Sequence, residues 1–118
     1  MTAKGFVFVA KVSDLQNGTM KAFPVDGRMI LIAMITGKLY AADNKCPHLG
    51  GNLSMGHLDG TVVTCPRHAS QFDLVDGKVL RWTNWTGVMK LGANIFRPAR
   101  RLHTYPVKVE GGNILVGI

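Results

Sequence analysis

Short apolar segments separated by glycine-containing turns run along most of this chain. Turn pairs such as Asp26-Gly27 and Asp59-Gly60 tolerate the positive φ that tight hairpins require. This alternation predicts an all-β fold, a small antiparallel β-sandwich or barrel, with one helical turn that Ser13 caps. The predicted strands cover residues 6–12, 20–25, 29–35, 38–42, 61–64, 71–74, 78–80, 105–109 and 113–116.

The apolar pattern loses its period over residues 82–97, which predicts a long loop or inserted excursion there. The 118 residues otherwise suit one domain, residues 1–118, because a chain of this length can bury a single core. The longest apolar run, residues 29–35, is far shorter than the roughly 20 residues of a membrane-spanning helix, so we expect no membrane span. No small-residue cleavage site follows the short apolar stretch before Lys11, and we expect a cytoplasmic protein.

Positive charge is concentrated in one part of the chain. The sequence has 14 Lys and Arg against 7 Asp and Glu, a net charge of +7. Residues 77–109 contain seven of the basic residues and no acidic one, so the whole excess lies in this segment. It could face solvent, an acidic protein, nucleic acid or an anionic membrane. Because Trp82, Trp85 and Phe96 favour burial, we expect residues 82–97 to cap a sheet edge or form an oligomeric contact.

The two cysteines lie in closely similar sequence contexts, and each has a histidine within three residues. Thiolate and neutral imidazole are common ligands of zinc and iron, so Cys46, His48, Cys65 and His68 form a candidate metal site. The remaining histidines have no such cysteine neighbour. The two motifs read CPHLG at residues 46–50 and CPRHASQFD at residues 65–73.

Two metal centres use two cysteines and two histidines. A structural zinc site normally has both cysteines before both histidines, and this chain does not follow that order. A [2Fe-2S] cluster can instead have cysteines on one iron and histidines on the other. The observed order, C-x-H, sixteen residues and then C-x2-H, fits the second arrangement.

These two motifs resemble the cluster-binding loops of the Rieske [2Fe-2S] family, particularly its small soluble ferredoxins. The likeness covers most of the chain except the excursion, and it implies the Rieske fold with a cluster-binding subdomain of two loops at about residues 44–75. It also implies that both cysteines hold the buried iron and both histidines the outer iron, which takes up the electron. The resemblance implies contacts around the cluster from Leu49, Pro66, Ser70 and Phe72, and no catalytic residue.

The sequence departs from the family pattern at specific positions. Gly51 and Arg67 stand where respiratory and photosynthetic Rieske proteins have a pair of disulfide-forming cysteines. Phe72 replaces a tyrosine of the high-potential members, whereas Ser70 is retained. Hydrogen bonds to cluster sulfur stabilise the more negative, reduced state, so we expect a low to intermediate reduction potential.

The resemblance implies a one-electron carrier that moves electrons from a reductase to an oxygenase or another oxidoreductase. Transfer would occur at the edge formed by His48 and His68, with Leu49, Pro66 and Arg67 as the surrounding contact surface. One alternative is a small Rieske subunit docked permanently in a larger oxidoreductase, such as a nitrite reductase. A zinc-containing nucleic-acid module is a third hypothesis, although nucleic acid is not the partner we expect.

Overall fold

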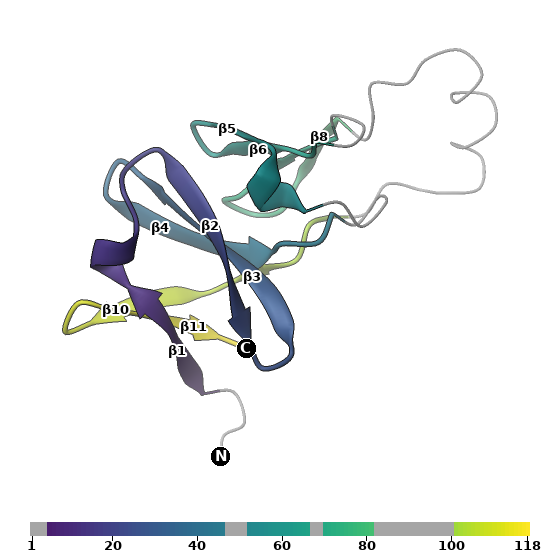
Figure 1. The fold of residues 1–118 in the computed structure, drawn as a ribbon. Coiled ribbons are helices and arrows are strands. Elements are labelled where there is room, and N and C mark those ends of the chain that lie inside the picture. Colours follow the sequence, from purple (N-terminus) through teal and green to yellow (C-terminus); the bar gives the residue numbers. More distant parts are fainter. Residues whose placement is uncertain (1–4, 47–51, 67–69, 82–100) are drawn as a thin grey trace, which may run out of the picture.

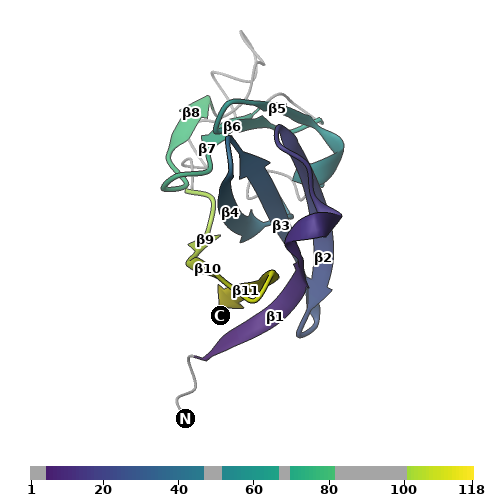
Figure 2. The ribbon, with the colours of Figure 1, turned by 90° about the vertical axis from the view of Figure 1, so that its left-hand side faces the viewer.

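Three antiparallel sheets make up the part of the protein that the computed structural model describes, residues 5–46, 52–66, 70–81 and 101–118. The second sheet lies between the other two in both views (Figure 1) (Figure 2). No α-helix occurs among these described residues, and the predicted all-β antiparallel fold is confirmed.

The first sheet has the order β1 (Phe6–Lys11), β11 (Asn113–Gly117), β10 (Val107–Glu110). The second has the order β2 (Thr19–Val25), β3 (Arg28–Ile35), β4 (Lys38–Asp43), β9 (Thr104–Tyr105). The third has the order β5 (His57–Asp59), β6 (Val62–Thr64), β7 (Gln71–Asp73), β8 (Val79–Arg81).

Strand β3 separates two hydrophobic cores. Its alternate side chains point to opposite faces, so Ile30 and Ile32 pack on one side and Leu31 and Ala33 on the other. All four are fully buried, which explains why residues 29–35 are continuously apolar instead of alternating. The sandwich core, on the first side, also contains Ala10, Leu15, Val25, Met34, Ala41, Tyr105, Ile114 and Val116. The loop-side core, on the second side, also contains Ala42, Cys46, Leu53, Val63, Cys65, Phe72, Leu74 and Leu102.

Tight turns connect the strands of the second sheet. Asp26 and Gly27 both have positive φ, 53° and 82°, and join β2 to β3 as a two-residue hairpin with Val25 paired to Arg28. This is the geometry that the Asp-Gly pair predicts. The hairpin between β3 and β4 uses two residues of positive φ in the same way.

Two predicted elements differ from the structure. The helical turn is a 3-10 turn, η1 (Val12–Asp14), and its N-cap is Lys11, so the prediction that Ser13 caps it is wrong. The N–H of Lys11 donates to the carboxylate of Asp14 over 3.0 Å, which satisfies this end of the turn. The predicted strand 105–109 is split at Pro106, because β9 pairs with β4 and β10 pairs with β11.

Two short elements were not predicted, the 3-10 turn η2 (Leu53–Met55) and strand β5. Strand β5 has one apolar residue, Leu58, between two polar ones, and η2 is a single turn, so neither has a periodic apolar pattern. The excursion 82–97 lies outside the described residues, so its role as a cap or an oligomeric contact stays a prediction. None of the helical turns in the described part of the chain has the length and apolar character of a membrane-spanning helix.

Candidate functional site

Both cysteines lie in the loop-side core. Cys46 follows the end of β4 and is 2% exposed, and Cys65 directly follows β6 and is 3% exposed. They belong to one hydrophobic cluster, with Leu53 and Phe72 among its members, and no disulfide joins them. The structure therefore brings the two predicted cysteine ligands to the same buried region from segments nineteen positions apart in the sequence.

The first loop, which follows Cys46, is held together at its base. The backbone carbonyl of Asn44 accepts the N–H of Leu53 over 2.8 Å, and its side-chain Oδ1 accepts the N–H of Ser54 over 2.8 Å. The next pair into the loop, Lys45 and Asn52, forms an isolated antiparallel β-bridge. Asn44 is 3% exposed, so its hydrogen bonds are shielded from water and fix where the loop begins and ends.

The second loop, which follows Cys65, has a similar base. The N–H of Cys65 donates to the carbonyl of Ser70 over 2.8 Å. One step back, Thr64 and Gln71 pair between β6 and β7, and Gln71 Nε2 donates to Thr64 Oγ1 over 3.2 Å. Each cysteine thus lies at the start of a loop whose two ends are hydrogen-bonded together.

The other predicted site residues divide into two groups. Ser70 and Phe72 are completely buried beside the cysteines, whereas Pro66 is exposed. His48, Leu49, Arg67 and His68 lie outside the described residues, so their roles stay predictions. Within the described part of the chain, which includes two of the four predicted ligands, no three potential metal-binding side chains form a group.

Sequence reasoning missed a hydrogen-bonded network at the junction of β3, β4 and β9. Arg28 Nη1 donates to the hydroxyl of Tyr105 over 3.2 Å, and that hydroxyl donates to Asp43 Oδ1 over 2.5 Å. Burial, and next the hydrogen bond to Asp43, raise the pKa of Tyr105 above its ordinary value. The network ends three residues before Cys46, and no local pattern could reveal it because Asp43 and Tyr105 are 62 positions apart.

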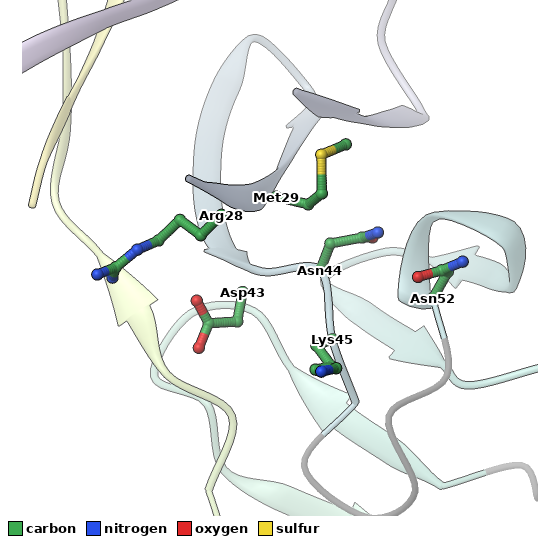
Figure 3. A pocket seen from close by; sticks show the side chains of 6 residues that line it. All are labelled: Arg28, Met29, Asp43, Asn44, Lys45 and Asn52. Atoms are coloured by element: carbon green, nitrogen blue, oxygen red, sulfur yellow. The ribbon is translucent and has the colours of Figure 1, made fainter. Parts of the chain in front are cut away.

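A surface pocket of about 320 Å³ opens beside the base of the first loop. Figure 3 shows Arg28 and Asp43 on one side of it and Asn44 extending towards Asn52 on the other. Met29 and Lys45 complete the lining. The charged side chains of the lining have both signs, and four of the six lining residues are exposed, so we assign no ligand to the pocket.

The described donor set fits a metal centre. Two thiolates in an apolar core are strongly disfavoured unless a cation neutralises them, and a bound metal provides that charge. Cys46 and Cys65 are also presented by two neighbouring loops of fixed base, and each loop carries a histidine in its sequence. Thiolate with imidazole suits iron and zinc alike, so this chemistry alone does not choose between them.

Comparison with known proteins distinguishes these two metals. The family model of the Rieske [2Fe-2S] domain matches residues 5–106. The chain is 30% identical to the ferredoxin component of the naphthalene 1,2-dioxygenase system of Pseudomonas putida, over 100% of this chain and 99% of that protein. It is similar to the ferredoxin of carbazole 1,9a-dioxygenase from Nocardioides aromaticivorans, with a TM-score of 0.77, 27% identity and coverage of 95% and 96%. It also matches a solved complex of reduced oxygenase and oxidized ferredoxin in carbazole 1,9a-dioxygenase, with a TM-score of 0.75, 25% identity and coverage of 94% of this chain and 100% of the matched chain.

Proposed function

The chain belongs to the Rieske [2Fe-2S] domain family, and from this premise we propose that it carries single electrons from a reductase to a terminal oxygenase or a related oxidoreductase. The observation that carries the proposal is the burial of Cys46 and Cys65 in one core at the bases of two loops. The relatives named above are ferredoxin components of dioxygenase systems, and they are not the components that transform the substrate. This chain is accordingly an electron-transfer protein with one Rieske cluster.

Four residues are proposed as the cluster ligands, Cys46 and Cys65 on the inner iron and His48 and His68 on the outer iron. When bound, the cluster supplies one-electron chemistry, being neutral overall with both irons ferric and gaining one negative charge on reduction. The described residues support the cysteine half of this assignment, because both thiols are shielded from water by the loop-side core. We propose one domain over residues 1–118, with a cluster-binding subdomain at about residues 44–75.

The environment of the cysteines also supports a low to intermediate potential. Phe72 is completely buried in the loop-side core and has no hydroxyl to donate to a cluster sulfur. A member of the family with tyrosine there has one more donor that stabilises the reduced state. Ser70, completely buried at the base of the second loop, is the proposed remaining side-chain donor.

The proposed partners are a reductase and a terminal oxygenase. The naphthalene and carbazole systems named above act on different compounds, so the substrate of the partner oxygenase is not proposed. A permanently docked subunit is not favoured, because the naphthalene relative, which matches over 100% of this chain, is named as the ferredoxin component of its dioxygenase system. We propose a cytoplasmic location, supported by the assignment of both cysteines to the cluster, which leaves none for a disulfide.

Electron paramagnetic resonance of the purified protein after dithionite reduction tests this function. We expect a rhombic signal with the low average g of a histidine-ligated cluster, accompanied by two irons and two sulfides for each chain. The oxidised protein should then be reduced by a ferredoxin reductase and reoxidised by a terminal oxygenase. A protein that gives no signal and contains zinc would contradict the proposal, because zinc has no redox chemistry.

A further inference from the structure

The three-residue turn η2 lies between the two cysteine-bearing segments and is tied to the first of them. Its first two N–H groups, from Leu53 and Ser54, donate to the backbone and side-chain oxygens of Asn44. Asn44 itself donates its N–H to the carbonyl of Met29 over 3.1 Å, which connects this point to β3. Because Asn44 is two residues before Cys46, the position of η2 relative to Cys46 is fixed by short hydrogen bonds to a buried residue.

The residue that follows η2, Gly56, closely approaches the second cysteine-bearing segment. Gly56 follows η2, and its N–H donates to the carbonyl of Leu53 over 2.9 Å. A Cβ atom at Gly56 would lie 2.0 Å from the carbonyl oxygen of Thr64 and 3.0 Å from Cδ of Pro66. Thr64 and Pro66 are the two neighbours of Cys65. The φ of Gly56 is −94°, so this close approach selects glycine here, and no left-handed conformation is involved.

The peptide unit between Thr64 and Cys65 is therefore held from both sides. Its carbonyl oxygen faces Gly56, and its N–H, on Cys65, donates to the carbonyl of Ser70. Movement of this peptide unit towards Gly56 is limited by the close approach of that residue, and movement away from Ser70 lengthens the hydrogen bond of Cys65. The placement of Cys65 thus depends on how closely Gly56 approaches the carbonyl oxygen of Thr64.

We propose that Asn44 and Gly56 are positioning residues, which use η2 as a spacer to set the separation between Cys46 and Cys65 for cluster binding. The inference rests on the proposed function, since the spacing is required by a cluster that both cysteines hold. The route runs from Cys46 through Asn44, along η2, and through Gly56 to the peptide unit of Cys65.

The size of the effect follows from the steric limit. A Cβ at Gly56 must move from 2.0 Å to at least 3.0 Å from the Thr64 oxygen, a displacement of about 1 Å. Metal–ligand distances vary by only about 0.2 Å around their preferred values. The displacement therefore exceeds the tolerance of the site several-fold.

Two variants with matched controls test the proposal. Gly56→Ala introduces the steric conflict at the cysteine segment, and Gly117→Ala introduces one in β11, on the sandwich core, 2.9 Å from Cγ of Pro106. Asn44→Ala removes the side-chain bond to η2, and Asn52→Ala removes an exposed amide at the same loop base that makes no capping bond. The measurements are iron and sulfide for each folded chain, the g values after dithionite reduction, the midpoint potential and the thermal unfolding temperature.

We expect Gly56→Ala and Asn44→Ala to lower cluster content roughly tenfold when cluster is limiting, and to shift the g values of the cluster that remains. The two controls should keep wild-type g values and potential, even where Gly117→Ala lowers the unfolding temperature. If Gly56→Ala does not fold, Asn44→Ala decides, because it removes the hydrogen bond from Ser54 without adding a steric conflict.

The inference is overturned if both positioning variants bind a full cluster with wild-type g values and potential. It is also overturned if the controls lose as much cluster at an equal loss of stability, because the effect would then be general destabilisation. A wild-type protein without the rhombic signal would instead reject the proposed function. The failure of one is therefore distinguishable from the failure of the other.

Discussion

Removal of the Tyr105 hydroxyl tests whether the network of Arg28, Tyr105 and Asp43 stabilises the junction of β3, β4 and β9. In Tyr105→Phe the ring stays in the sandwich core, where the side chain is 9% exposed, and only the hydroxyl is lost. Asp43 then loses a donor at 2.5 Å and Arg28 loses an acceptor at 3.2 Å. The variant therefore isolates two hydrogen bonds from the packing around them.

The expected loss is about 1–2 kcal/mol of unfolding free energy. Hydrogen bonds to charged groups contribute about 1.5–3 kcal/mol each, but the half-exposed Asp43 and the exposed Arg28 regain part of this from water. For a domain of this length, such a loss lowers the unfolding temperature by roughly 4–10 °C. Because Asn44, and not Asp43, contacts η2, we expect the g values of the reduced protein to stay unchanged.

Tyr40→Phe is the matched control, since Tyr40 is the other tyrosine and no side-chain hydrogen bond of it is found among the described residues. Chemical denaturation of both variants and of the wild type gives the free energies. A double-mutant cycle of Tyr105→Phe with Asp43→Asn should give a coupling energy of about 1 kcal/mol. Equal stability of Tyr105→Phe and Tyr40→Phe would refute the reasoning.

Four further expectations follow from the same structure. The pKa of Tyr105 is raised on folding by burial and by Asp43. The contribution of Tyr105 to stability is therefore complete below about pH 10 and is lost as the pH rises through the folded pKa. In denaturation experiments, the unfolding free energy of Tyr105→Phe should fall less steeply with alkaline pH than that of Tyr40→Phe. Phe72→Tyr should raise the midpoint potential by roughly 60 mV, one tenfold change for a one-electron couple, and a redox titration without an upward shift contradicts the role given to Phe72. Leu31→Ala and Ile32→Ala should each cost about 2–5 kcal/mol, but only Leu31→Ala, which opens the loop-side core, should speed cluster loss to a chelator. Removal of the iron should reduce hydrogen-exchange protection in β5 to β7 more than in β10 and β11, because only the loop-side core contains the cysteines, and equal loss in both regions contradicts this division.

The elements that could be predicted from the sequence are those with a local physical cause. Asp26-Gly27 adopts the positive φ values that the pair favours, and the hairpin it forms pairs Val25 with Arg28. The continuous apolar run of β3 correctly indicated a strand, although its length alone did not reveal that it is buried on both faces. Such features depend on backbone preference and on side-chain period, which a single sequence contains.

The elements that could not be predicted depend on contacts between distant segments. Strand β5 has three residues and is defined by its pairing with β6, and Tyr105 meets Asp43 and Arg28 across 62 and 77 positions. Of the candidate site, the cysteine pair is found in one core, whereas the predicted ligands His48 and His68 lie outside the described residues. The proposed spacing role of Gly56 could not be predicted either, because nothing in the sequence distinguishes it from the other 13 glycines.

The two faces of β3 contribute to different properties of the protein, stability on one side and the environment of the cysteines on the other. The sandwich core joins the first and second sheets and contains neither cysteine, so substitutions there change stability with little effect on the environment of the cluster. The loop-side core contains both cysteines together with Leu53 and Phe72, so a change of volume there acts on the ligands and on the packing at once. A carrier of this kind can therefore be tuned in potential on one face of β3, while the opposite face keeps the fold stable for docking with its partners.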